Sequence, residues 1–146
     1  MHPKNILIVD DDPDDCEFFT MVIEQIHPEI KVFAVTSNEE LFHHLEQHTP
    51  DLLFVDAFIQ HESGLSSIVK IRNQEKFHQL PVIMYTGSTS FKNVANAFAA
   101  GASAYIVKPH TLAEIKSVLE KALLQNWDQP IRKQYYLDGE FHDFEK

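Results

Sequence analysis

The stretch ILIVDDDPDD, residues Ile6 to Asp15, places four apolar residues directly before a group of five aspartates. An uninterrupted apolar run of this length is typical of a strand that is buried on both faces of a parallel sheet. Like charges repel, and a carboxylate that loses its water needs a partner. The aspartates therefore indicate either a solvated helix start or a site that holds positive charge.

Four further short apolar runs follow along the chain, and amphipathic segments with apolar residues every three or four positions separate them. The runs are KVFAV (31–35), LLFV (52–55), PVIMY (81–85) and AYIV (104–107). Helix-start signals occur at Asp12 with Pro13, Ser37 with Glu40 and Thr111 with Glu114, and Gly101 is a helix-end signal. Five strands alternating with five helices predict an α/β domain with a parallel sheet.

Composition narrows the classes of protein that fit. A net charge of −10 argues against non-specific nucleic-acid binding, which needs clustered Lys and Arg. No stretch approaches the ~20 apolar residues of a membrane span. The one cysteine, Cys16, cannot form an internal disulfide, and we expect a cytoplasmic protein without a membrane partner. We expect one domain over residues 4–127, and a C-terminal tail over residues 128–146 with no output domain.

Polar residues follow four of the five predicted strands. Such sheets place their sites outside the carboxyl ends of the strands, so these residues should meet at one edge. They are Asp10 to Asp12 after the first strand, Asp56 after the third, Thr86 after the fourth and Lys108 after the fifth. Carboxylates are ligands of Mg²⁺, an aspartate can be a nucleophile toward phosphorus, and a lysine and a hydroxyl can stabilise a phosphoryl group.

Four motifs in this order resemble the receiver domain of two-component response regulators, of the single-domain CheY-like kind. They are LIVDDD (7–12), LLFVDAF (52–58), IMYTG (83–87) and GASAYIVKP (101–109), and the resemblance covers roughly residues 4 to 126. It implies a doubly wound (βα)5, flavodoxin-like fold, with a five-stranded parallel sheet in the order 2-1-3-4-5.

The resemblance also implies roles for individual residues. Asp56 would be the phosphoacceptor. Asp10 and Asp11 would form the acidic pair, with Asp11 the direct ligand of Mg²⁺, and Asp56 and the backbone carbonyl of Phe58 would complete the metal site. Lys108 would pair with Asp56 at rest and with the phosphoryl group afterwards. The Lys108–Pro109 peptide bond would be cis, since the family holds this lysine at a tight turn.

Switching is implied in the same way. Thr86 would move to the phosphoryl group, and Tyr105 would swing inward into the vacated space. A histidine kinase or a histidine phosphotransfer protein would donate the phosphoryl group. The face made by the fourth helix, the fifth strand and the fifth helix would change and dock a partner, with the C-terminal tail as part of that surface. Such a protein would accept one phosphoryl group and not be a turnover enzyme.

The sequence departs from this family in the loop after Asp56. The family's Met-Pro pair is replaced by Ile59 and Gln60, while Gly64 is in place. The missing proline should loosen the loop, though a turn is still possible. Phe58 is a bulky apolar residue that would border the path of an attacking water. We therefore expect slowed or altered self-dephosphorylation.

Other interpretations remain open at this point. Asp10 and Asp12 nominally fit the D-x-D motif of a haloacid-dehalogenase-type phosphatase, and a pseudo-receiver would keep the fold without being phosphorylated. Thr86 could cap the following helix, and Tyr105 could be a core residue. Asp12, Asp14 and Asp15 are expected to belong to the start of the first helix. His44 and His48 have a zinc-like spacing but are better explained as a solvated helix face.

Overall fold

The apolar run that opens the sequence forms the inside of the sheet. The computed structural model describes residues 3–88, 90–128 and 133–144. In it, β1 (Asn5–Val9) pairs in parallel with β2 (Lys31–Val35) on one side and β3 (Leu52–Val55) on the other. β6 (Val82–Thr86) and β7 (Ala104–Val107) continue the sheet in the order β2-β1-β3-β6-β7. The predicted doubly wound α/β fold and its strand order are confirmed.

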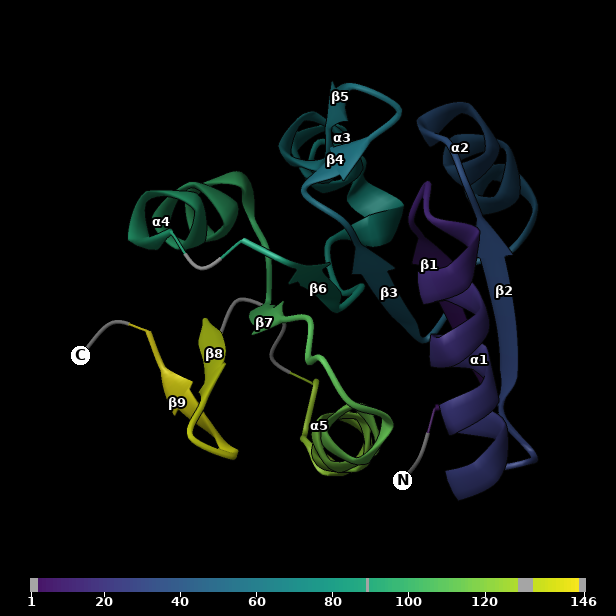
Figure 1. Ribbon diagram of the computed structural model, residues 1–146. Helices are drawn as coiled ribbons and strands as arrows, with labels where there is room; N and C mark the ends of the chain where they lie inside the picture. The colour runs from purple at the N-terminus through teal and green to yellow at the C-terminus, as the bar shows by residue number, and fades with distance from the viewer. Residues whose placement is uncertain (1–2, 89, 129–132, 145–146) are drawn as a thin grey trace.

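Helices cover both faces of this sheet (Figure 1). α1 (Pro13–Ile26) and α5 (Leu112–Leu124) pack on one face. α2 (Asn38–Gln47), α3 (Gly64–Arg72) and α4 (Phe91–Ala100) pack on the other, and the short 3-10 helix η1 (Glu75–Phe77) follows α3. Each face buries its own apolar layer, which is why the strands read as continuous apolar runs. None of the helices in the described part of the chain is both long and apolar enough to cross a membrane.

The predicted helix boundaries rest on local hydrogen bonds. The side chains of Asp12, Ser37 and Thr111 accept hydrogen bonds from backbone N–H groups in the first turns of α1, α2 and α5. Gly101 ends α4 in the left-handed region, with φ 115°. Because these signals act within a few residues, they are readable from sequence alone.

The loop after Asp56 is an ordered hairpin. β4 (Phe58–Ile59) pairs antiparallel with β5 (Glu62–Ser63), and the two residues between them, Gln60 and His61, have φ of 51° and 68°. Two consecutive residues with positive φ are what a two-residue type I′ hairpin requires. A turn therefore forms without the family's proline, supported by strand pairing and by the fully buried Ile59, and the looser loop stays a prediction.

A second hairpin extends the sheet beyond β7. Residues of the expected C-terminal tail form β8 (Gln134–Leu137), parallel to β7, and β9 (Glu140–Asp143), antiparallel to β8. Phe144 packs on Phe98 of α4, with ring centroids 4.6 Å apart, and Phe141 packs against Trp127, 6.1 Å away. The described part of residues 128–146 thus continues both apolar layers. Figure 1 shows the hairpin beside β7.

Removing the Phe144 ring should therefore destabilise the whole domain. We expect Phe144→Ala to lower the free energy of unfolding by about 1–3 kcal/mol, because the half-buried ring contacts Phe98 and Tyr135. Leu137→Ala is the control, since Leu137 lies in the same hairpin but is 49% exposed, and it should cost less than about 0.5 kcal/mol. Urea denaturation measures both. Equal effects would show that the hairpin does not contribute to the core.

Candidate functional site

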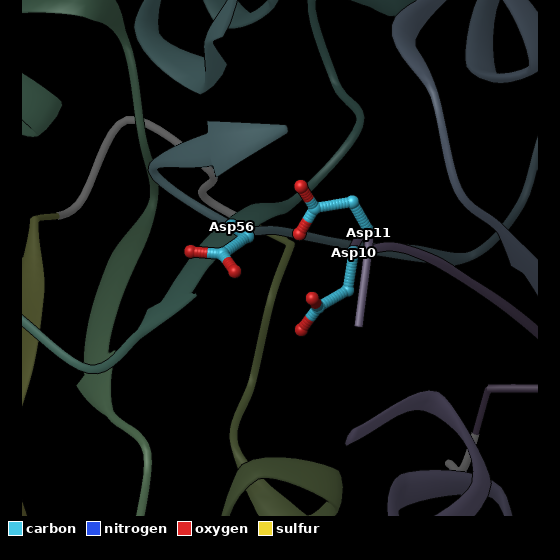
Figure 2. Close-up of side chains that lie close together, drawn as sticks. All are labelled: Asp10, Asp11 and Asp56. Carbon is cyan, nitrogen blue, oxygen red and sulfur yellow. The ribbon is translucent and has the colours of Figure 1, made fainter. Parts of the chain in front are cut away.

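Three carboxylates converge at the carboxyl ends of neighbouring strands. Asp10 directly follows β1, Asp56 directly follows β3, and the last residues of these strands, Val9 and Val55, are paired in register. Ligand oxygens of Asp10, Asp11 and Asp56 all lie within 4.8 Å of one another (Figure 2). Asp10 is buried, Asp56 is half-buried and Asp11 is exposed. Three carboxylates that close together suit a hard divalent cation such as Mg²⁺, so the donor set fits the expected metal.

Lys108 is the positive charge at this cluster. Its Nζ lies 2.6 Å from Asp10, 2.8 Å from Asp15 and 3.1 Å from Asp56, all through Oδ2 atoms. Its backbone N–H donates to the carbonyl of Thr86, which fixes the end of β7 beside the end of β6. Burial by itself would lower the pKa of Lys108, but the hydrogen bonds and charges of Asp10, Asp15 and Asp56 outweigh burial and raise it. The lysine therefore stays charged throughout the physiological range.

The Lys108–Pro109 peptide bond is trans, because no cis bond occurs among the described residues. The cis expectation carried over from the family is wrong for this structure. The trans form is the intrinsically favoured isomer, and Nζ reaches all three carboxylates with it.

Burial sets the protonation of Asp10. Desolvation raises its pKa from 3.8 to about 6, although the hydrogen bonds from Lys108 and from the N–H of Asp12 oppose the rise. Since the folded-state pKa lies above the unfolded one, the protonated form is favoured by folding. The contribution of Asp10 to stability is thus fully present below pH 4 and is lost as the pH rises through about 6.

This linkage gives a pH-dependent prediction for the cation-free protein. Between pH 4 and pH 6.5, the free energy of unfolding of the wild type should fall relative to that of Asp10→Asn by roughly 2–3 kcal/mol, since the amide does not titrate. Urea denaturation of both proteins in chelator, at half-unit pH steps, measures the difference. A difference that stays constant over this range would show that Asp10 is not perturbed.

One backbone contact ties the β4–β5 hairpin to the acidic cluster, and a second closes the loop that follows Asp56. The N–H of Gln60, at the turn, donates to Oδ2 of Asp11 over 2.8 Å. The N–H of Gly64 donates to the carbonyl of Ala57, also over 2.8 Å, at the start of α3. A Cβ at Gly64 would overlap the carbonyl oxygen of Asp56. Only glycine allows α3 to begin this close to the residue after β3.

The other aspartates of the opening stretch divide into two roles. Asp12 caps α1 by accepting from the N–H of Asp14, as predicted. Asp15 was expected only to favour the start of this helix, but its carboxylate reaches Lys108. No helical spacing links Asp15 to the acidic pair, because Asp11 precedes Asp12, the N-cap of α1, so the sequence carries no local signal for this contact.

Thr86 and Tyr105 both lie inside the protein. Thr86 is the last residue of β6 and is buried, while α4 has Ser90 as its N-cap, so the alternative of Thr86 as a helix cap is wrong. Tyr105 of β7 is 2% exposed, and its hydroxyl donates to the carbonyl of Ser88 over 2.9 Å. Tyr105 thus already occupies the inward position that the resemblance assigns to the switched form, and its movement stays a prediction.

Two other candidate groups, Cys16 and the pair of His44 and His48, do not form a site like the aspartate cluster. Cys16 is buried against the carbonyl of Asp10, and burial raises the pKa of its thiol to about 11, so it is an inert packed residue. The rings of His44 on α2 and of His48, the C-cap residue of that helix, lie 5.6 Å apart. Among the described residues, the aspartate cluster is the one group of at least three His, Cys, Asp or Glu side chains with metal-binding spacing.

Comparison with known proteins identifies a family model and curated relatives that this chain resembles. Residues 6–120 match the family model described as the response regulator receiver domain. The chain is 34% identical over 119 residues to the heme response regulator HssR of Staphylococcus saprophyticus, covering 79% of this chain and 51% of that protein. It is 33% identical over 109 residues to the CAI-1 autoinducer sensor kinase/phosphatase CqsS of Vibrio cholerae serotype O1, covering 74% and 16%.

Solved structures show the same likeness. A two-component response regulator from Clostridium difficile superposes with a TM-score of 0.70 at 27% identity, covering 83% of this chain and 95% of that one. By contrast, the chain spans about half or less of the length of the first curated relatives that it matches.

Proposed function

The chain belongs to the response regulator receiver domain family, and from this premise we propose that Asp56 accepts a phosphoryl group in a reaction that requires Mg²⁺. The observation that carries the proposal is the contact of Lys108 with Asp56 inside a cluster that also contains Asp10 and Asp11. A half-buried carboxylate beside a fixed lysine and a cation-binding group has the surroundings that a nucleophile toward phosphorus needs.

The proposed step transfers one phosphoryl group from the donor to Asp56. A carboxylate oxygen of Asp56 attacks phosphorus, the bond from phosphorus to the donor breaks, and the donor group leaves with the electron pair. The product is an acyl phosphate. Lys108 can follow the phosphoryl oxygens because its Nζ lies 3.1 Å from Asp56, and the hydroxyl of Thr86 would donate to one of them.

A bound Mg²⁺ would supply positive charge against the phosphoryl oxygens. We assign its protein ligands to Asp10, Asp11, Asp56 and the backbone carbonyl of Phe58, with Asp11 as a direct ligand. The N–H of Gln60 holds the carboxylate of Asp11, which supports an ordered position for that ligand. Phe58 is 65% exposed in β4, next to this group, so its ring is available to restrict an attacking water and slow self-dephosphorylation.

The donor is proposed to be a histidine kinase or a histidine phosphotransfer protein in the cytoplasm. We place the docking face at α4, β7 and α5, as the family resemblance implies. In this chain β8 pairs with the outer edge of β7. Lys121 of α5 donates a hydrogen bond to the carbonyl of Gly139, which lies between β8 and β9. A partner that reads this face therefore meets the C-terminal hairpin as part of the surface.

Incubation with acetyl phosphate and Mg²⁺, followed by intact-protein mass measurement, tests the proposal. A receiver should take up about one phosphoryl group and then stop, and chelator should prevent uptake. Sustained release of phosphate would instead indicate a haloacid-dehalogenase-type phosphatase. Absence of any adduct would indicate a pseudo-receiver that binds partners without being phosphorylated.

A further inference from the structure

The three N–H groups of the Lys108 ammonium are shared among three carboxylates. An ammonium group has three donors, and Nζ has one partner each in Asp10, Asp15 and Asp56. The contact with Asp56, at 3.1 Å, is longer than the contact with Asp15, at 2.8 Å. Asp10 and Asp56 have places in the phosphoryl-transfer site already described, whereas Asp15 has none.

Asp15 is placed for this contact by the start of α1. Asp12 and Pro13 fix the first turn of the helix, and Asp15 follows within that turn. Its side chain is 35% exposed, against 1% for Asp10 and 14% for Asp56, so it approaches Lys108 from the solvent side of the cluster. Asp14, one residue earlier in the same turn, is exposed, and its backbone N–H donates to Asp12.

We infer that Asp15 is a positioning residue that holds Lys108 as a shared counterion and competes with the phosphoryl group for it. To follow the phosphoryl oxygens, the lysine must weaken one of its existing contacts, and the negative charge of Asp15 opposes that movement. This inference rests on the proposed function of Asp56 and adds to it a residue that restrains its rate.

The test is the rate of phosphoryl uptake from acetyl phosphate at saturating Mg²⁺. Asp15→Asn keeps the size and one acceptor oxygen of the side chain but removes its charge, and should accept the phosphoryl group about 3- to 10-fold faster than the wild type. Asp14→Asn is the matched control, with the same change of charge in the same helical turn, and should stay within about twofold. Asp15→Ser should behave like Asp15→Asn.

A double-mutant cycle with Lys108→Ala separates this role from a structural one. If Asp15 acts through the lysine, Asp15→Asn should have no more effect than Asp14→Asn once Lys108 is absent. Equal rates for Asp15→Asn and Asp14→Asn, a slower Asp15→Asn protein, or the same acceleration without Lys108 would each overturn the inference. A wild-type protein that takes up no phosphoryl group would instead overturn the proposed function of Asp56.

Discussion

Replacing Asp56 by Asn is expected to reduce phosphoryl uptake from acetyl phosphate by at least roughly 10³-fold, to no detectable adduct. The amide has the shape of the carboxylate, but its oxygen is not a nucleophile toward phosphorus at neutral pH. The side chain can still accept a hydrogen bond from Lys108, so the fold should be retained. Intact-protein mass after incubation with Mg²⁺ measures the loss.

Asp51→Asn is the control for this experiment. Asp51 precedes β3, as Asp56 follows it, and its carboxylate accepts hydrogen bonds from the N–H groups of Lys4 and Asn5 away from the acidic cluster. This variant should be phosphorylated at close to the wild-type rate. An adduct on Asp56→Asn would show that another side chain is the acceptor, and the assignment of Asp56 would be withdrawn.

Gly64→Ala is expected to damage both stability and the site. The added Cβ would overlap the carbonyl oxygen of Asp56, and this oxygen belongs to backbone that cannot easily move. The N–H of Asp56 is bonded to the carbonyl of Val9, and the N–H of Gly64 to that of Ala57. We expect a loss of about 3 kcal/mol in the free energy of unfolding. In the protein that remains folded, displacement of Asp56 should slow phosphoryl uptake about 10- to 100-fold.

Gly87→Ala is the matched control for the stability effect. A Cβ at Gly87 has no described atom within 4 Å, so the change should alter the free energy of unfolding by no more than about 1 kcal/mol in either direction. Urea denaturation compares the two alanine variants directly. Equal stability of Gly64→Ala and Gly87→Ala would show that the approach of α3 to Asp56 is not as close as described.

Much of the fold could be predicted from sequence because its signals are local. The apolar runs mark strands buried on both faces, and caps such as Asp12 and Thr111 act within one helical turn. Predicted strand limits were accurate to one residue, with β6 starting at Val82 and taking in Thr86 as its last residue. The convergence of Asp10, Asp56 and Lys108 was also predictable, because parallel strands bring their carboxyl ends to one edge.

Features that depend on one segment meeting another were decided only by the tertiary structure. In the sequence, Asp15 is interpreted as a residue that favours the start of a helix. Its contact with Lys108, 93 positions away, forms only when α1 lies beside the end of β7. The Gln60–His61 turn has no glycine or asparagine to announce its positive φ, so strand pairing and the burial of Ile59 decide it.

The C-terminal hairpin shows the same division. The Asp138–Gly139 pair, with φ of 53° and 83°, is a local signal for the hairpin turn. No local pattern says where this hairpin packs, and its strands continue the two apolar layers beside β7. By itself, the sequence determined the α/β class and the acidic edge with Asp10, Asp11, Asp56 and Lys108, because these follow from periodicity and from the geometry of parallel sheets. The strand order was implied by the resemblance to the receiver family. Only the tertiary structure decided which third carboxylate shares the lysine and what covers the edge of β7, because those contacts join residues that no local pattern links.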